Sequence, residues 1–288
     1  MKLGVFSTFC PEYTFPEACK LIKALGFQGV QPRIVPAEAA VFDPAKPFNP
    51  WGNNKGGLSE NDFFANPKSV LKPAYDAGLE ITSVASYTGT ADMKRALAMV
   101  QACAQAGIKQ VRISALPMPK EEVFDIHAYL QRSRATYLEL IGEAKKAGVR
   151  PCIELHMGTP YPSASGICAF LKGIPPEDVG VLYDPGNMVY EGWEAAAVGL
   201  NLLGPYLAEV HVKNSKWVPD SDDPRGVRTW KPVAAHLEDG CVNWAQIIEK
   251  LKLHGYKGWL IEEGHTAERD TYTRLKMAHE LLSRLIKA

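Results

Sequence analysis

Four residues whose side chains can bind a metal ion lie within otherwise apolar segments of the sequence. They are Glu154 in PCIELHMG, Asp184 in VGVLYDPGN, His211 in AEVHVKN and Glu263 in GWLIEEGH. If the fold brings them together, the carboxylates would repel one another and lose hydration unless a cation joined them. Mostly oxygen donors with one nitrogen suit Mn²⁺, Mg²⁺ or Co²⁺ better than a structural zinc ion. The set therefore predicts one divalent metal ion with open coordination positions.

Each of the four residues also has an ordinary structural interpretation when it is taken alone. A single Glu or Asp at the end of a strand often caps a helix or forms half of an ion pair. A single His is more often only hydrogen-bonded. The metal hypothesis therefore depends on whether the surrounding elements place all four residues together.

Short β-rich segments alternate with helical patterns along the whole chain. The predicted strands are residues 3–7, 29–34, 80–87, 110–115, 150–156, 179–184, 207–214 and 258–264. The predicted helices are roughly residues 14–25, 68–77, 91–106, 127–147, 163–173, 191–203, 243–254 and 267–287. Several of these helices end in a glycine, and the next strand follows closely, which is typical of tight αβ turns beside a parallel sheet.

This alternation predicts an α/β fold, a single (β/α)8 TIM barrel that forms one domain over residues 1–288. A dinucleotide-binding open sheet is disfavoured, because the first strand is followed by STFCPEY and not by GxGxxG. In a barrel, the C-terminal ends of the parallel strands meet at one mouth. Glu154, Asp184, His211 and Glu263 end four successive strands, so we expect them to converge there.

Two of the predicted loops at this mouth are long, residues 35–67 after the second strand and residues 215–242 after the seventh. Long loops in a compact domain are usually lids or binding loops. We expect at least one of them to cover the substrate, with Trp51, Trp217 or Trp230 as an apolar wall. Surface decoration or an oligomer contact is the alternative.

The composition limits the partners of the protein. Lys+Arg and Asp+Glu both number 32, and this zero net charge argues against nucleic acid or an anionic membrane as the main partner. The six cysteines form no CxxC pair, which favours free thiols in a reducing compartment. The first residues lack the cationic and apolar pattern of a secretory signal. We therefore expect a soluble cytoplasmic protein.

The motifs around the four residues resemble those of the xylose isomerase-like superfamily of TIM-barrel sugar isomerases and epimerases. The resemblance runs from Met1 to the last predicted helix and is strongest in LGFQGVQPRI, CIELH, LYDPGNMVYEG, GPYLAEVHVKN and LEDGCVNWAQIIEKLKLHGYKGWLIEE. It implies one divalent ion, commonly Mn²⁺, bound by Glu154, Asp184, His211 and Glu263. Glu262 competes for the last position, but the family spacing favours Glu263 and leaves Glu262 pointing outward.

Three further residues follow from the same resemblance. His156 matches the histidine of the family's E-N-H motif, as a base or as a hydrogen-bond partner of the substrate. Lys213 matches the lysine of the H-V-K motif, where it could neutralise an oxyanion or pair with a carboxylate. Asn187 is expected to contact substrate, although ketose 3-epimerases of the superfamily tend to have histidine at its position.

Other polar residues are singled out by the strand pattern alone. Gln31, Arg33 and Arg112 lie in strand-like segments and are expected either to contact the substrate or to form ion pairs in the barrel wall. His265 lies two residues after Glu263, where a role in a loop or a helix start is expected.

The resemblance implies a metal-dependent sugar isomerase or epimerase that removes a proton next to a carbonyl, with Glu154 and Glu263 moving the proton. A lyase on the same scaffold is the alternative, either of an inosose dehydratase type or of a 3-oxo-C-glycoside-cleaving type with a small partner subunit. An apurinic-site endonuclease would need several zinc ions and a basic groove, and a non-enzymatic barrel would not need the full ligand set. We expect an unphosphorylated sugar or keto-sugar as substrate; a homo-oligomer is left open.

Overall fold

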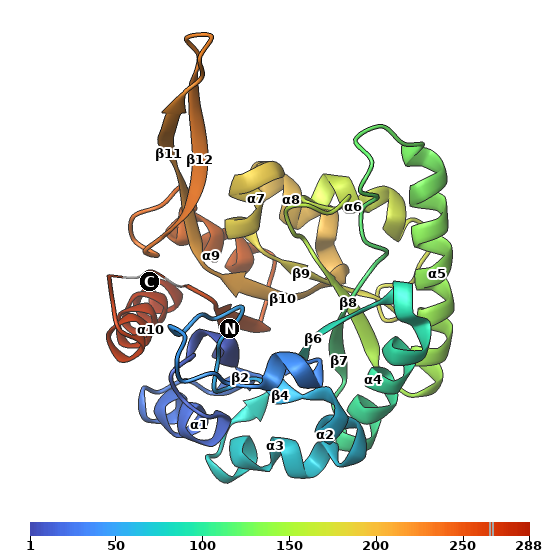
Figure 1. The fold of residues 1–288 in the computed structure, drawn as a ribbon, viewed down its shortest axis with the longest axis vertical. Helices are drawn as coiled ribbons and strands as arrows, with labels where there is room; N and C mark the ends of the chain where they lie inside the picture. Colours follow the sequence, from blue (N-terminus) through green and yellow to red (C-terminus); the bar gives the residue numbers. More distant parts are fainter. Residues whose placement is uncertain (265, 267) are drawn as a thin grey trace.

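The protein is described by a computed structural model that covers residues 1–264, 266 and 268–288. The parallel strands form a closed ring surrounded by helices, which confirms the predicted TIM barrel (Figure 1). The strands of this sheet are β1 (Lys2–Phe6), β2 (Gly29–Gln31), β3 (Arg33–Val35), β4 (Leu58–Ser59), β5 (Glu80–Ile81), β6 (Val84–Gly89), β7 (Gln110–Ser114), β8 (Arg150–Glu154), β9 (Gly180–Tyr183), β10 (Leu207–Val212) and β13 (Trp259–Glu262).

The second predicted strand is divided into β2 and β3 because Pro32 lies between them. Proline has no backbone N–H to donate to a neighbouring strand. The Pro32 carbonyl still accepts a hydrogen bond from Ala85 N, so the two segments keep one direction. β2 pairs with β1 and β5, and β3 pairs with β6, so the ring continues across the break. β1 pairs with β13 on its other side, which closes the barrel.

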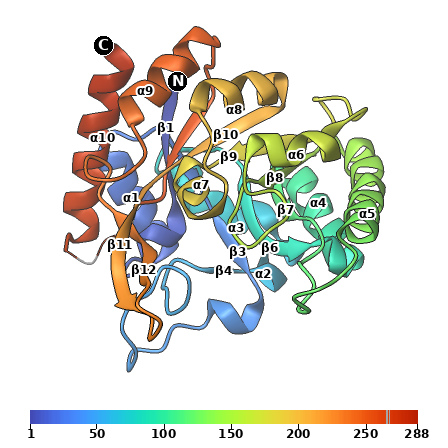
Figure 2. The ribbon, with the colours of Figure 1, turned by 90° about the horizontal axis from the view of Figure 1, so that it is seen from above.

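The helices lie outside the ring of strands, as the view from above also shows (Figure 2). They are α1 (Phe15–Ala24), α2 (Glu60–Ala65), α3 (Pro67–Asp76), α4 (Met93–Ala106), α5 (Ile126–Lys146), α6 (Ala164–Leu171), α7 (Pro185–Glu191), α8 (Ala196–Leu203), α9 (Trp244–Leu253) and α10 (Thr271–Lys287). Local sequence explains their starts: in α1, Thr14 and Glu17 form a capping box. The predicted αβ turns at Gly26, Gly78, Gly107, Gly148 and Gly255 all have positive φ, which glycine adopts without strain.

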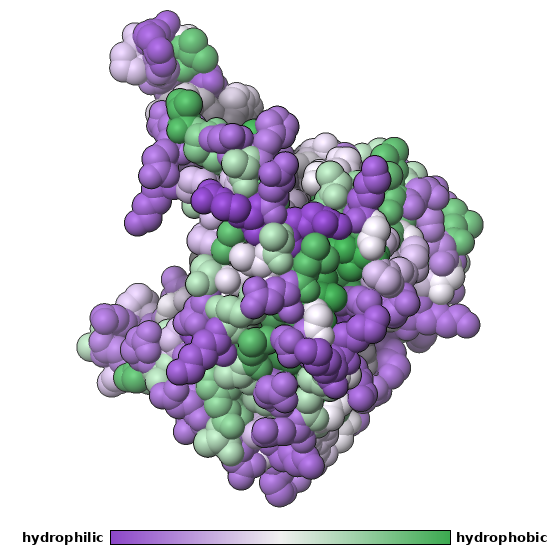
Figure 3. All heavy atoms as spheres, turned by 90° about the vertical axis from the view of Figure 1, so that its right-hand side faces the viewer, coloured by the Kyte–Doolittle hydropathy of each residue, from purple (hydrophilic) through white to green (hydrophobic). Residues whose placement is uncertain are grey.

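Both long loops contain secondary structure that the sequence patterns did not reveal. The loop after the seventh barrel strand contains an antiparallel hairpin of β11 (Asn214–Asp222) and β12 (Arg228–Ala235). This hairpin projects beyond the ring of helices, and the space-filling view shows it standing clear of the body (Figures 1 and 3). The loop after the second strand contains β4 and α2. Among the described residues, no helix combines the length and the apolar character needed to cross a lipid bilayer.

Candidate metal centre and active site

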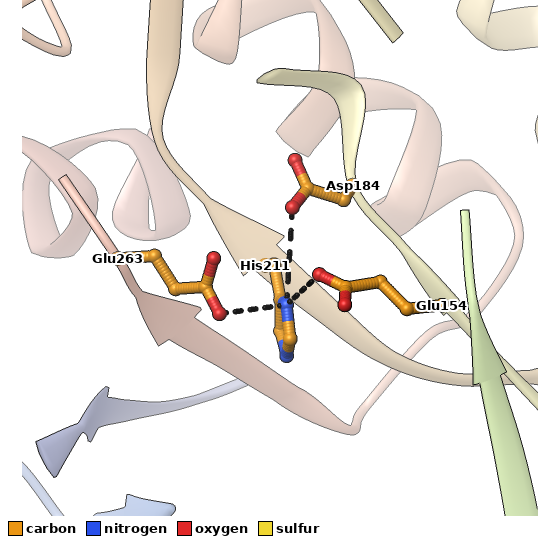
Figure 4. Close-up of side chains that lie close together, drawn as sticks. All are labelled: Glu154, Asp184, His211 and Glu263. Atoms are coloured by element: carbon orange, nitrogen blue, oxygen red, sulfur yellow. Dashed lines mark hydrogen bonds and ion pairs between the residues drawn. The ribbon is translucent and has the colours of Figure 1, made fainter. Parts of the chain in front are cut away.

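Four neighbouring strands bring the four predicted metal ligands to one mouth of the barrel. Glu154 is the last residue of β8, Asp184 follows β9, His211 lies in β10, and Glu263 follows β13. These strands are consecutive in the sheet, in the order β8-β9-β10-β13. Figure 4 shows the three carboxylates pointing towards the imidazole of His211 from separate strands. The spatial convergence expected from the sequence is therefore present.

The imidazole of His211 is the central point of this cluster. Its Nδ1 lies 3.0 Å from Glu154 Oε1, 2.8 Å from Glu263 Oε1 and 3.9 Å from Asp184 Oδ2. All four residues are buried, and one potential ligand atom of each lies within 4.8 Å of all the others. Such a group could hold a single metal ion.

Two cationic side chains border the cluster on opposite sides. Lys213 Nζ lies 2.7 Å from Asp184 Oδ2 and 2.9 Å from Glu263 Oε2. Arg112 Nε lies 3.0 Å from Glu154 Oε2. Lys213 therefore pairs with carboxylates, which is one of the two roles expected for it, and Arg112 forms an ion pair in the barrel wall.

These contacts shift the proton affinities of the cluster in different directions. Burial alone would lower the pKa of the His211 imidazole, but Glu263 and Glu154 raise it to about 10. Burial raises the pKa of Asp184 to about 6 despite the nearby Lys213. Burial would also raise the pKa of Glu263, but His211 and Lys213 lower it to about 2. Without a metal ion, a protonated His211 thus serves as the cation that the carboxylates require.

The donor set fits a divalent ion. Glu263 Oε1 and Glu154 Oε1 are both buried and lie 2.8 Å and 3.0 Å from His211 Nδ1, so two carboxylate oxygens share one nitrogen and its single proton. An ion bound to a neutral imidazole would satisfy both oxygens. Formally, three carboxylates, two cationic side chains and one divalent ion leave a single positive charge, which suits a substrate that becomes negatively charged.

A cavity of about 450 Å³ opens above the cluster. Of the residues expected near substrate, Arg112, His156, Asn187 and Lys213 line this cavity, together with Glu154. The cavity wall also includes Trp51, Tyr87, Met157, Tyr190, Asn214, Ser215 and Ala234. The structure thus places polar groups and aromatic rings around one open cavity beside the candidate metal centre.

Comparison with known proteins places the chain in a family. Residues 19–286 match the family described as xylose isomerase-like TIM barrel. The chain belongs to this family. The resemblance seen in the sequence motifs is therefore confirmed.

Individual relatives of the family show how far the similarity extends. An inosose dehydratase of Geobacillus kaustophilus is 27% identical over 152 residues, which are 49% of this chain and 48% of that protein. The chain thus spans about half the length of the curated relatives that it matches. A 3-keto-D-glucoside 4-epimerase from E. coli has a similar structure, with a TM-score of 0.67, 16% identity and coverage of 100% of both chains. A xylose isomerase-like protein of Mycobacterium smegmatis in complex with magnesium gives a TM-score of 0.65 at 16% identity, over 99% of this chain and 97% of that one. At such low identity the structural matches show the fold alone.

Asp184 has a second role, at the start of a helix. It is the N-cap of α7, because its Oδ1 accepts a hydrogen bond from Asn187 N at 2.9 Å. Asn187 Nδ2 then donates to Asp184 Oδ2 at 2.7 Å and to Leu155 O at 3.1 Å. The capping role and the place in the cluster, which the sequence presented as alternatives, are thus both present.

The structure separates Glu262 from Glu263. Glu262 Oε1 and Oε2 accept hydrogen bonds from Arg274 Nη1 of α10, at 2.7 Å and 2.9 Å. Since α10 covers the outside of the barrel, Glu262 points outward as expected, and Glu263 points into the mouth. The prediction made for His265 lies outside the described residues.

Two further predicted substrate contacts lie below or beside the cavity. Gln31 is fully buried, and its Nε2 lies 2.9 Å from Glu209 Oε2 and 3.3 Å from His211 Nε2. The Arg33 guanidinium lies 4.9 Å from the centre of the Tyr87 ring, and its Nη2 donates to Trp51 O. Gln31 thus supports a cluster residue from beneath, and Arg33 connects a wall of the cavity to the loop after the second strand.

The two tryptophans of the hairpin lie outside the cavity wall. Trp217 Nε1 donates a hydrogen bond to Val189 O of α7, and Trp217 and Trp230 are 41% and 55% exposed. They share one face of the hairpin, because Trp217 pairs with Pro232 and Pro219 pairs with Trp230. Trp51, the third predicted tryptophan, does line the cavity.

Sequence reasoning missed Glu209 and Tyr87. Glu209 is buried in the barrel beneath His211, where burial raises its pKa, and Ser83 Oγ donates to it at 2.8 Å. Alternation along AEVHVKN could have revealed it, since Glu209, His211 and Lys213 are spaced by two and share one face. Tyr87 ends the third predicted strand, and no sequence feature distinguished it from other aromatic residues of the strands.

Proposed function

We propose that this protein is a divalent-metal-dependent isomerase or epimerase of keto-sugars whose first step removes a proton next to the carbonyl group. The observation that carries the proposal is the placement of Glu154 and Glu263, which face His211 Nδ1 from different strands at 3.0 Å and 2.8 Å. Two carboxylates on opposite sides of one centre can remove a proton from one face of a carbon and return one at another. The proposed substrate is a small sugar held in the cavity above them.

A divalent ion held by Glu154, Asp184, His211 and Glu263, with Mn²⁺ as first choice and Mg²⁺ or Co²⁺ as alternatives, would polarise the carbonyl and stabilise an enediolate. The chain's own residues bind and orient the sugar. Lys213 and Arg112 line the cavity and pair with the carboxylates, so they set the charge of its floor. Trp51 offers an apolar wall against which the C–H face of a sugar can pack.

A dehydratase-type lyase is the second candidate, and two observations favour it. Several of the curated relatives that match about half of the chain are inosose dehydratases. His156 provides the additional titratable group that a lyase needs for its leaving group. Its Nδ1 lies 2.6 Å from Met157 O, so the neutral ring carries its proton there and leaves Nε2 as an acceptor.

Solvent exchange and the His156→Ala variant test these proposals together. Keto-sugars would be incubated in D₂O with the Mn²⁺-loaded protein, and deuterium in recovered substrate would be measured by NMR and mass spectrometry. Both candidate reactions predict exchange at the carbon next to the carbonyl. An isomerase should retain appreciable kcat in His156→Ala and bind substrate more weakly, whereas a lyase should lose turnover at unchanged metal content. Turnover without any exchange would refute the shared first step.

Metal removal is the direct test of the cofactor. Treatment with a chelator should abolish turnover, and added Mn²⁺ should restore it. A metal-free protein with full activity would refute the metal-dependent proposal. A cytoplasmic location, one domain over residues 1–288, and a homo-oligomer or small partner subunit stay predictions.

A further inference from the structure

A second cavity of about 490 Å³ adjoins the one above the metal cluster. It lies among the segments that follow β6, β7 and β8, on the side of the mouth away from Lys213. The two cavities share Tyr87, Arg112, Glu154, His156 and Met157 in their walls. A molecule bound at the cluster can therefore extend past these shared residues into the second cavity.

The two cavities differ in chemistry. Away from the shared residues, the second cavity is lined largely by apolar side chains, among them Leu116, Pro117, Met118, Ile153 and Pro160. Apolar walls stabilise a ligand in proportion to the apolar surface that they bury. Methionine adapts its shape and makes favourable contacts with aromatic rings.

Few polar groups interrupt this lining. Thr159 Oγ1 is engaged, because it donates to His156 O at 2.6 Å. Thr88 Oγ1 and Tyr161 Oη are buried and have no hydrogen-bond partner among the described residues, so two hydroxyls remain for ligand oxygens. A second sugar ring carries several hydroxyl groups, and burying them without partners would be unfavourable.

We infer that the substrate is a keto-sugar that carries an apolar substituent, an aryl or alkyl glycoside, with the sugar in the first cavity and the substituent in the second. The inference rests on the proposed function for the sugar end of the molecule. The first cavity alone has room for a monosaccharide, since pockets for whole small ligands begin at roughly 300 Å³. A free monosaccharide would leave the apolar cavity unused.

Ser114 offers a way to fill the second cavity without touching the cluster. It lines the second cavity only, is exposed, and lies two residues after Arg112 on β7. In Ser114→Trp the indole should occupy the space that we assign to the substituent. Ser114→Ala is the matched control, and Met118→Glu tests the same cavity by charge if the tryptophan variant does not fold.

The test compares methyl and phenyl 3-keto-β-D-glucopyranoside by titration calorimetry on the Mn²⁺-loaded protein. The wild type and Ser114→Ala should bind the phenyl compound at least about tenfold more tightly, and this ratio should fall to about one in Ser114→Trp and in Met118→Glu. Equal affinities in the wild type, or a ratio that persists in both cavity variants, would overturn the inference and leave the proposed function standing. Binding of neither compound, together with no solvent exchange for any keto-sugar, would overturn the proposed function and the inference with it.

Discussion

The buried ion pair between Glu262 and Arg274 gives a sharp test of the arrangement at the end of β13, in which Glu262 faces outward and Glu263 faces the cluster. Arg274 Nη1 makes two hydrogen bonds to the fully buried Glu262, and Nη2 donates to Phe9 O. Arg274→Met keeps the apolar bulk but leaves the Glu262 carboxylate buried without its cation. Loss of one partner of a buried pair costs about 3–5 kcal/mol, so the free energy of unfolding in urea should fall by that amount at pH 7.

The pH dependence of this loss has a definite sign. Burial already raises the pKa of Glu262, and Arg274 opposes this, so removing Arg274 should raise the pKa further. A carboxyl whose pKa is higher in the folded than in the unfolded state stabilises the folded protein at low pH. This contribution to the free energy of unfolding disappears as the pH rises through the folded-state pKa. The destabilisation by Arg274→Met should therefore be smallest near pH 5 and grow towards pH 8.

The double variant Glu262→Gln/Arg274→Met is the control. It removes both charges, so it should be more stable than Arg274→Met alone at pH 7. Mn²⁺ affinity should be unchanged in Arg274→Met, because Arg274 pairs with Glu262 and not with Glu263. A loss below about 1 kcal/mol that is also independent of pH would refute the burial argument, and a collapse of Mn²⁺ affinity in folded protein would refute the assignment of Glu263.

Three further predictions concern the cluster and the hairpin. Asp184→Asn keeps a capping side chain for α7 but removes a ligand charge, so Mn²⁺ affinity should fall at least about a hundredfold while circular dichroism and Tm stay near wild type. Because the pKa of His211 is raised to about 10 in the metal-free protein, Mn²⁺ must displace a proton at pH 7. Calorimetry of Mn²⁺ binding in buffers of different ionisation enthalpy should show that about one proton is released per ion. The apparent Mn²⁺ affinity should rise about tenfold per pH unit from pH 7 to 8. Binding without proton release would contradict the raised pKa of His211. Replacing hairpin residues 220–229 by a two-residue turn should change the free energy of unfolding by less than about 0.5 kcal/mol, and a larger loss would show that the hairpin tip supports the barrel.

The sequence is sufficient to predict the barrel, because strands and helices follow from local patterns. The convergence of the four cluster residues then follows from the barrel, which brings the C-terminal ends of its strands to one mouth. Each feature used can be recognised from neighbouring residues in the sequence: glycines at helix ends, β-rich segments and charged residues in apolar strands. The choice of Glu263 over Glu262 came from family spacing, and the ion pair with Arg274 supplies its physical reason. Strand alternation alone makes one of two adjacent residues face inward but does not say which.

What the sequence did not reveal depends on contacts between distant segments. The sequence predicts only a loop where the hairpin lies, because both of its strands are largely exposed and carry no alternation of buried apolar and exposed polar residues. The sequence leaves open whether Gln31 contacts substrate or lies in the barrel wall, and its place beneath His211 depends on strand stagger. The second cavity lies between the segments that follow β6, β7 and β8. No pattern within one of these segments could predict it.

The closure of the barrel by β1 against β13 has a consequence for how the protein comes to be folded. The register that joins Lys2 to Trp259 connects segments from nearly opposite ends of the sequence, and such contacts form late because a very long loop must close first. During synthesis, the strands bearing Glu154, Asp184 and His211 emerge before the one bearing Glu263. The nascent chain can thus gather an incomplete set of ligands, and the candidate metal centre is completed only by the segment that also closes the barrel.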